Sequence, residues 1–383
     1  MKSIMPESMQ RVYIFTIILW HVIFFERNLM GQLTTSPFSA EDFLFCKRSL
    51  SKVSRTFALN IKILEGDLHK SVLLCYLLCR IIDTIEDCPN KNAEWKIKLL
   101  NDFSHYLEVH DDENLGLWIS QALKGEAKPA ERELLEQTFC VLRGYWSLPE
   151  DLRTNNKIWV TEMSDGMGQY ILKFSSTKNI VLKDRSELED YCYYVAGTVG
   201  RFLTASFKDY YKFSSGVFDT LDKNAVSFGV GLQLTNIAKD VIEDRLRGWT
   251  YLPLSYLEKY SLSLVDFIEL NPHHHPLIEK AYLDLLDDAL IHLKQALEYT
   301  LDIPVQLLRP RIFCLWPLWM ALETLIVLKD QHRNLMLGKK VKITRKKVKE
   351  IMAKTTLMAP FNELLRQDFK NKLEKYEALS PIG

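Results

Sequence analysis

The chain has 383 residues, of which 47% are hydrophobic and 26% charged, enough to bury the core of one large domain or of two small ones. Lysine plus arginine and aspartate plus glutamate each number 49, so no net field attracts nucleic acid, and any charged site must be local. With only 15 glycines and 13 prolines, the composition favours helices. It therefore argues against a polynucleotide-binding protein.

The amino-terminal region contains an apolar run, VYIFTIILWHVIFF, over residues 12–25. A helix of this length spans only about 21 Å, short of the ~30 Å hydrocarbon core of a bilayer. No small-residue cleavage site of a signal peptide follows it. We expect either an interfacial membrane anchor or a dispensable extension that precedes a start at Met30.

The seven cysteines are scattered through apolar runs and form no CxxC pair of the kind that binds zinc. We expect reduced core thiols in a cytoplasmic protein.

From about Ser39 onward, apolar residues recur at helical spacing, and almost no alternating strand pattern occurs. The chain carries turn signals near residues 65–67, 88–92, 124–131, 145–156, 211–216, 271–276 and 301–304. No linker, repeat or low-complexity tract divides it. We predict one all-α domain over 39–383, preceded by an extension over 1–38. Residues 361–383 are amphipathic and charged, so we expect no membrane span there.

The stretch YLLCRIIDTIEDCPNK, residues 76–91, places carboxylates at the end of an apolar helix. Tyr76, Arg80, Asp83 and Asp87 are 4, 3 and 4 residues apart and so share one face, whereas Leu and Ile cover the rest. A helix that is apolar around most of its circumference is buried. The polar stripe then faces the protein interior. The alternative is an ordinary salt bridge of Arg80 with Asp83 or Asp87 on a solvated flank.

A second stretch, GVGLQLTNIAKDVIEDR, repeats this pattern. On its polar face lie Gln233, Asn236, Asp240 and Asp244. Gly229 and Gly231 at its start allow a neighbouring backbone or a ligand to approach. Facing buried carboxylates repel one another, and a divalent cation is the natural way to neutralise them.

Oxygen ligands of this kind suit Mg²⁺ or Mn²⁺, and Mg²⁺ typically shares its shell with water and substrate phosphates. A di-iron site would need Glu-x-x-His pairs, which these helices lack. The run His273–His275 lies in a proline-flanked loop, where a solvated turn is expected. The two stripes thus predict diphosphate bound through metal.

Five motifs together resemble the squalene/phytoene synthases, and within them the squalene synthase branch. They are SRTFALNI (54–61), CRIIDTIED (79–87), YCYYVAGTVG (191–200), LQLTNIAKDVIED (232–244) and RIFCLWPLWMA (311–321). The resemblance covers residues 40 to 350 and implies an isoprenoid-synthase fold around a central prenyl cavity. It also implies that the metal ligands are Asp83, Asp87, Asn236, Asp240 and Asp244.

The resemblance further implies roles for single residues. Arg55 and Arg80 hold the diphosphate as fixed cations, although a structural ion pair explains either one equally well. Tyr194 lies near the reacting carbons, where its ring can stabilise an allylic cation; core packing is the alternative. Gly197 and Gly200 are positions of close approach. Substrate contacts are implied for Phe57, Tyr76, Gln233, Lys239, Phe313 and Pro317.

The implied reaction joins two molecules of farnesyl diphosphate into a cyclopropyl diphosphate, which then rearranges and takes a hydride from NADPH to give squalene. No GxGxxG unit is present, so any NADPH site is not a Rossmann domain. The stretch GKKVKITRKKVK (338–349) resembles a basic segment of squalene synthases, and we assign Lys342 and Arg345 to the NADPH phosphates. A solvated face or contact with anionic lipid headgroups are the alternatives.

Two departures from the family pattern stand out. Lys239 replaces an arginine that is common beside the second acidic motif. In the loop RLRGWTYLP, Arg247 lies a little earlier than the arginine expected before the aromatic-x-Pro, so it is left unassigned. Eukaryotic members end in a membrane anchor that this chain lacks, so we expect an enzyme that associates peripherally with the membrane surface.

Other functions remain open. A family enzyme that stops at presqualene diphosphate, or that makes dehydrosqualene or phytoene without reduction, is the nearest. An inactive relative that serves as an assembly or binding protein is more distant. The sequence leaves the prenyl chain length and the oligomeric state open.

Overall fold

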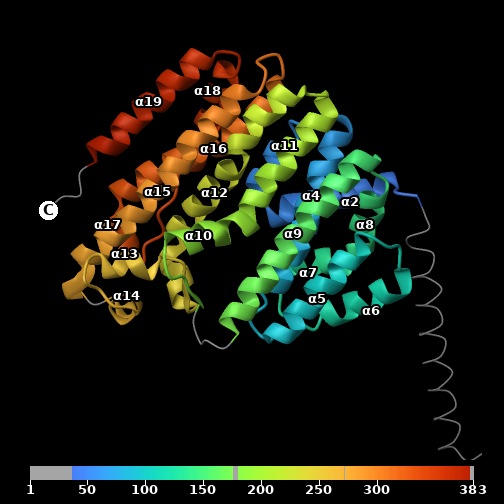
Figure 1. Ribbon diagram of the computed structural model, residues 1–383, viewed down its shortest axis with the longest axis horizontal. Coiled ribbons are helices and arrows are strands. Elements are labelled where there is room, and N and C mark those ends of the chain that lie inside the picture. Colours follow the sequence, from blue (N-terminus) through green and yellow to red (C-terminus); the bar gives the residue numbers. More distant parts are fainter. Residues whose placement is uncertain (1–36, 176–179, 271, 380–383) are drawn as a thin grey trace, which may run out of the picture.

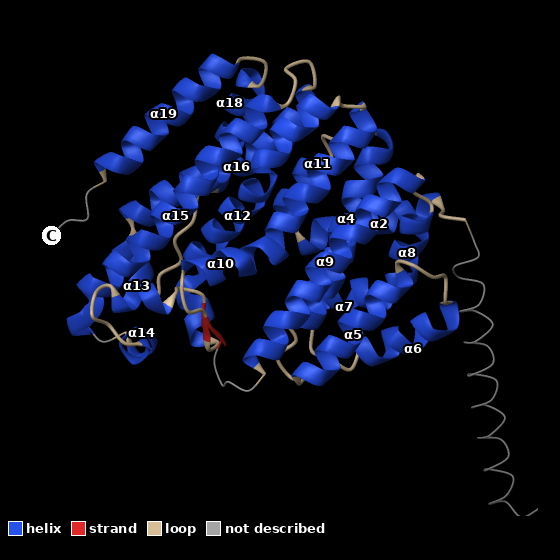
Figure 2. Ribbon diagram, in the orientation of Figure 1, coloured by secondary structure: helices blue, strands red, loops and turns tan. Residues whose placement is uncertain are grey.

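The computed structural model describes residues 37–175, 180–270 and 272–379, except the side chains of Arg55 and Asp112 (Figure 1). Helices make up almost all of this part, as Figure 2 shows, which confirms the all-α prediction. The apolar run over 12–25 lies outside the described residues.

The first half of the fold is built around α4, which packs against α2, α5, α7, α8 and α9. These helices are α2 (Ala40–Val53), α3 (Arg55–Ile61), α4 (Gly66–Glu86), α5 (Ala93–Tyr106), α6 (Asp112–Ala122), α7 (Pro129–Glu136), α8 (Thr138–Trp146) and α9 (Glu150–Phe174).

The second half is built around the long helix α12, which packs against α15, α11 and α16. Its helices are α10 (Arg185–Cys192), the π-helix η1 (Tyr193–Gly197), α11 (Thr198–Tyr211), α12 (Ser215–Leu246), α13 (Leu254–Glu258), α14 (Leu264–Glu269), the 3₁₀ helix η2 (Pro272–His274), α15 (His275–Asp302), α16 (Leu308–Asp330), α17 (His332–Met336), α18 (Arg345–Met358) and α19 (Asn362–Ala378).

Every predicted break coincides with a helix boundary. The sequence did not predict one small feature, a parallel pair of two-residue strands, β1 (Ile180–Val181) and β2 (Trp249–Thr250). These strands lie side by side in Figure 2. Because β2 follows the end of α12, the pair ties that end to the segment that leads into α10.

The first described helix, α2, begins at a capping box. The Ser39 hydroxyl accepts from the Asp42 amide, and the Asp42 carboxylate accepts from the Ser39 amide. The same carboxylate binds Arg143 of α8, with 2.6 Å between Oδ1 and Nη2. One aspartate thus both starts α2 and fixes it to α8.

Helix α11 lies unusually close to α12. A Cβ atom on Gly200 would lie 1.9 Å from the carbonyl oxygen of Ala225, so only glycine fits there. A Cβ on Gly197 would lie 2.9 Å from the ring of Tyr193. The prediction that these glycines mark close approaches is confirmed.

Among the described residues, α16 is one helix that could cross a membrane by length and composition, but 72% of its most apolar stretch is buried inside the protein. It packs against α3, α12, α15, α18 and α19. We therefore describe α16 as a core helix. All seven cysteines are free thiols and six are buried, as predicted.

Candidate active site

The polar stripe of α4 is centred on Arg80. Its Nη2 donates to the hydroxyl of Tyr76 at 3.2 Å, and its Nη1 lies 3.6 Å from Oδ2 of Asp83. The third nitrogen, Nε, is buried without a hydrogen-bond partner. A buried cationic donor that is left unpaired costs free energy, so this stripe is prepared to receive an anion.

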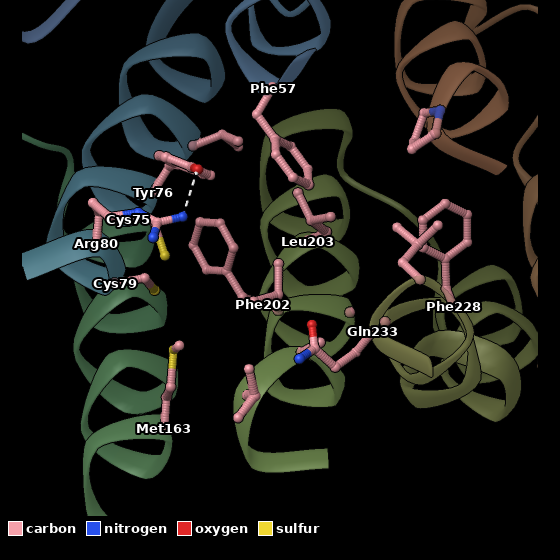
Figure 3. A pocket seen from close by; sticks show the side chains of 18 of the residues that line it. Phe57, Cys75, Tyr76, Cys79, Arg80, Met163, Phe202, Leu203, Phe228 and Gln233 are labelled. Atoms are coloured by element: carbon pink, nitrogen blue, oxygen red, sulfur yellow. Dashed lines mark hydrogen bonds between the residues drawn. The ribbon is translucent and has the colours of Figure 1, made fainter. Parts of the chain in front are cut away.

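This stripe faces a cavity of about 220 Å³ between the two halves of the fold. Figure 3 shows Tyr76, Cys79 and Arg80 projecting from one side, Phe228 and Gln233 from the other, and Phe57 from above. Eight predicted site residues line it: Phe57, Tyr76, Arg80, Asp83, Gln233, Asn236, Phe313 and Pro317. The remaining lining is mostly apolar and includes Met163, Phe202, Leu203 and Phe228.

The cavity changes character along its length. On α4, the lining residues run from Val72 to Asp83, and on α12 they run from Phe228 to Asn236. Both helices therefore turn from apolar to polar as they approach their carboxyl ends. Such a cavity suits a ligand that has a hydrocarbon tail and a charged head.

The acidic ends of the two helices influence each other. Burial raises the pKa of Asp83 to about 6; Arg80 opposes the rise, and Asp87 adds to it. Burial also raises the pKa of Asp244 to about 6, with further contributions from Asp240 and, across the gap between the helices, from Asp87. The two predicted motifs are thus brought together, and their carboxylates repel.

The oxygen atoms of the two acidic motifs fit Mg²⁺ on condition that a substrate phosphate shares the metal with them. Within the described residues, no three His, Cys, Asp or Glu side chains lie close enough to hold an ion by themselves. Mg²⁺, however, is usually held by one or two carboxylates together with substrate phosphates. The repelling carboxylates and the unpaired Nε of Arg80 match a metal that is shared with a diphosphate.

A second cavity, of about 340 Å³, lies on the other side of the α12 motif. Lys239 and Asp240 line it together with Lys342, so residues from two distant predicted segments meet there. Lys239 forms an ion pair with Asp240 at 3.1 Å, and Lys340 pairs with Glu243 at 2.7 Å. The basic segment is thereby attached to the acidic motif.

Four predicted residues with described side chains line neither cavity: Asp87, Asp244, Tyr194 and Arg345. Arg345 begins α18 and is exposed. Tyr194 belongs to η1, where its ring packs over Gly166 of α9 and against the ring of Tyr170, while its neighbour Val195 lines the first cavity. A Cβ on Gly166 would lie 2.1 Å from the Tyr194 ring. The side chain of Arg55, at the start of α3, is not among those that the structure describes.

Several groups beside the site were not assigned from the sequence. Burial raises the pKa of Glu86 well above its usual range, and Asp87 adds to the rise. The hydroxyls of Tyr191 and Tyr251 lie 3.1 Å apart. Burial raises the pKa of both tyrosines, and the charges of Glu86 and Asp87 add to the rise. Glu86 lies within the acidic stretch of residues 83–87, so its position in the sequence could have identified it. Tyr251 follows β2 and carried no sequence signal. Arg247, left unassigned, approaches Asp244 at 3.7 Å.

A model of the squalene/phytoene synthase family matches residues 50–347. The chain belongs to this family. Similar proteins include the squalene synthase of Rattus norvegicus, 29% identical over 80% of this chain and 68% of the rat protein, and that of Saccharomyces cerevisiae, 31% identical over 76% and 62%. The matched region thus spans about two thirds of these relatives' length.

Solved structures of the family have the same fold. TcSQS, in complex with a ligand, is 26% identical, with a TM-score of 0.72 over 88% of this chain and 96% of that one. A dehydrosqualene synthase in complex with a ligand is 22% identical, with a TM-score of 0.56 over 82% and 95%. The family assignment made from the motifs is confirmed. Since enzymes of both names share the fold, the fold does not distinguish their products.

Proposed function

We propose that this protein is a squalene synthase, which condenses two molecules of farnesyl diphosphate head to head and reduces the product with NADPH. The observation that most strongly supports this proposal is the first cavity. It is an apolar space that ends between two acidic motifs whose carboxylates repel, beside an arginine with an unpaired donor. The similarity to several squalene synthases supports the same function.

In the first half-reaction, the chain holds and orients the substrates. The aromatic and aliphatic walls, with Phe57, Phe202 and Phe313, receive the farnesyl tails and exclude water. Arg80, assisted by Arg55, binds the diphosphate and stabilises the charge that develops as it leaves.

Asp83 and Asp87 on α4, and Asn236, Asp240 and Asp244 on α12, would hold Mg²⁺ (or Mn²⁺). When bound, the metal neutralises the diphosphate and favours its departure. Lys239 lies near two of these groups, 3.1 Å from Asp240 and 3.4 Å from Asn236.

The ring of Tyr194 is proposed to stabilise the carbocation, and its hydroxyl to help remove the proton that is lost when the cyclopropane closes. Its ring packs over Gly166 of α9 and does not line the cavity, whereas its neighbours Val195 and Ala196 do. This role therefore requires its ring to leave Gly166 when substrate is bound.

In the second half-reaction, the cyclopropyl diphosphate would lose its diphosphate and rearrange as a cation, to which NADPH, when bound, would supply a hydride. Lys342 and Lys239 converge on the second cavity, next to the acidic motif, where they can bind nucleotide phosphates. Arg345, three residues after Lys342 at the start of α18, would add to the positive charge.

The test is incubation of purified protein with farnesyl diphosphate and Mg²⁺, with and without NADPH, followed by identification of the lipids. We expect squalene with NADPH, and the cyclopropyl diphosphate or unreduced products without it. An unreduced hydrocarbon at saturating NADPH would place the protein with enzymes that make dehydrosqualene or phytoene, an alternative that the fold does not distinguish, since a dehydrosqualene synthase shares it. No turnover with any prenyl diphosphate would support an inactive relative.

A further inference from the structure

The outer face of α18 and the turn into α19 expose two groups of side chains in succession. Lys346 and Lys349 are exposed in the first half of α18. Leu357 is 77% exposed near its end, and Phe361 and Leu364 follow at 55% and 52%. Spacings of 3, 8 and 11 residues keep Lys346, Lys349 and Leu357 on one face of the helix. We call Leu357, Phe361 and Leu364 the apolar crest.

The inner faces of the same two helices are firmly attached to α16. Buried Glu323 of α16 accepts from Lys372 of α19 and lies 3.3 Å from the ammonium of Lys347 of α18. Asp368 of α19 accepts from the indole of Trp319 at 2.7 Å and also binds Lys354. The crest is therefore presented by a fixed pair of helices.

The two lysines beside the crest, Lys346 and Lys349, have few charged partners within the described part of the chain. Lys349 has no ion pair or hydrogen bond among the described residues, and Lys346 only approaches Glu350 of its own helix, at 4.0 Å. The first turn of α18 has no acidic residue and three basic ones (Arg345, Lys346 and Lys347), although negative charge is favoured at a helix amino terminus. This charge pattern lowers the stability of α18 by itself; Glu323 compensates Lys347, and an anionic surface would compensate Lys346 and Lys349.

Arg311 joins the end of α15 to the turn between α18 and α19. This fully buried guanidinium donates to the carbonyls of Leu301 and Ile303 at the end of α15, and to Ala359 and Asn362 at the α18–α19 turn. The loop between α15 and α16, with exposed Val305, and the exposed Leu308 at the start of α16 are thereby joined to the crest. Figure 1 shows this loop and the α18–α19 turn together at the upper edge of the molecule.

The apolar end of the first cavity lies close behind this edge. Phe313 lines the cavity and lies on α16 about 7–8 Å along the axis from exposed Leu308. On α3, exposed Leu59 stands between Phe57 and Ile61, both of which line the cavity. The wall between cavity and surface is therefore one helix thick.

We propose that the apolar crest, with Lys346 and Lys349, docks on an anionic lipid bilayer. The leucines and the phenylalanine enter the interface, the lysines contact the headgroups, and the apolar end of the cavity then lies nearest to the membrane. Apolar side chains next to unpaired lysines on one helix face are typical of interfacial helices. The purpose of docking, delivery of an insoluble hydrocarbon, rests on the proposed function; docking itself does not.

The test measures co-sedimentation of the full chain with vesicles of phosphatidylcholine, alone or mixed with phosphatidylserine, in the absence of substrate. Leu357→Ser with Phe361→Ser should lower the partition coefficient on both vesicles by about tenfold or more. Lys346→Glu with Lys349→Glu should lower it about tenfold on the mixed vesicles and leave it unchanged on phosphatidylcholine.

The matched control is Leu117→Ser with Leu172→Ser, which removes equally exposed leucines (62% and 64%) from α6 and the end of α9, at the opposite edge of the molecule. This variant should bind as the wild type does, and circular dichroism should show every variant folded. Squalene formation in detergent should be unchanged by the crest substitutions, so loss of docking and failure of the proposed activity are separate results.

Two outcomes would overturn the proposal. Unchanged vesicle binding by the crest variants would show that another part of the chain, such as residues 12–25, carries any membrane contact. If size-exclusion chromatography showed a wild-type dimer that the crest substitutions dissociate, with vesicle binding unaffected, the crest would be an interface between two copies of the chain.

Discussion

Gly229 of α12 touches the backbone of Ala196 in η1, so closely that a Cβ on the glycine would lie 1.9 Å from the alanine carbonyl oxygen. The predicted close approach at Gly229 is therefore confirmed. This contact sets the distance between two walls of the first cavity, since Ala196 and Gly229 both line it.

Gly229→Ala should therefore destabilise the protein by about 3 kcal/mol or more, because backbone must move to relieve the overlap. The matched control is Gly168→Ala in α9, where an added Cβ meets nothing within 4 Å and should stabilise by about 0.5–1 kcal/mol. Urea denaturation of both variants measures the difference. Equal stability of the two variants would mean that the helices separate easily.

The helical period was enough to predict the part of the cavity that carries charge. Arg80, Asp83 and Asn236 stand out because a polar residue on an otherwise apolar helix has few explanations, and the structure places all three in the lining. Phe202 and Met163 line the same cavity but were not predicted. An apolar side chain has the same sequence signal whether it faces a cavity or packed core.

The orientation of Tyr194 was not available from the sequence for a different reason. Residues 193–197 form a π-helix, in which one extra residue per turn rotates the side chains relative to a continuous α-helix. The YCYYVAG motif identified the segment, but a helical wheel drawn through it misplaces the ring. Long-range contacts, such as the ion pair of Lys340 with Glu243 that brings Lys342 and Lys239 to one cavity, depend on how α12 packs and equally leave no local signal.

Asp83→Asn and Asp240→Asn should each reduce product formation by at least about 100-fold while the protein stays folded, because each replaces a negatively charged carboxylate of the expected metal site by a neutral amide. The double variant should be little worse than either single one, since such ligands act as a unit. Asp219→Asn, an exposed position on the same helix α12, is the control and should retain activity. Product assays with and without a chelator provide the measurement. Turnover that resists the chelator would contradict a metal-dependent site.

Asp288 predicts a pH effect on stability away from the active site. It lies 2.9 Å from Arg185 and accepts from Tyr256, yet burial raises its pKa from 3.8 to about 6, although Arg185 opposes the rise. Because the folded protein holds this proton more tightly than the unfolded chain, its contribution to stability is full below pH 4 and is lost as the pH rises through 6.

Asp288→Asn removes this dependence. Relative to the wild type, the variant should gain up to about 3 kcal/mol of unfolding free energy between pH 4 and pH 7, the equivalent of two pKa units. Urea denaturation of both proteins at several pH values gives the difference in unfolding free energy directly, because the contributions of the other titrating groups are the same in both proteins and cancel. A difference that is constant with pH, or that falls as the pH rises, would show that Arg185 keeps Asp288 ionised.

Lys342→Ala with Arg345→Ala should weaken only the reductive half of the proposed reaction. The side chains of the first cavity, which are proposed to drive ionisation, come from other segments, whereas Lys342 lines the second cavity. We expect squalene to fall while the cyclopropyl diphosphate accumulates or drains into unreduced and hydroxylated products. Most of the effect should come from Lys342, since Arg345 does not line that cavity.

The control for this variant is Lys370→Ala with Lys375→Ala, which removes two exposed cations from α19. Added salt should imitate part of the loss in the wild type, because exposed contacts between cations and phosphates are screened over about 8–10 Å at physiological ionic strength. Lipid analysis at varied NADPH concentration separates the two halves, and a raised KM for NADPH is the expected signature. If both half-reactions fell equally, residues 339–349 would support the fold of the site and not the nucleotide.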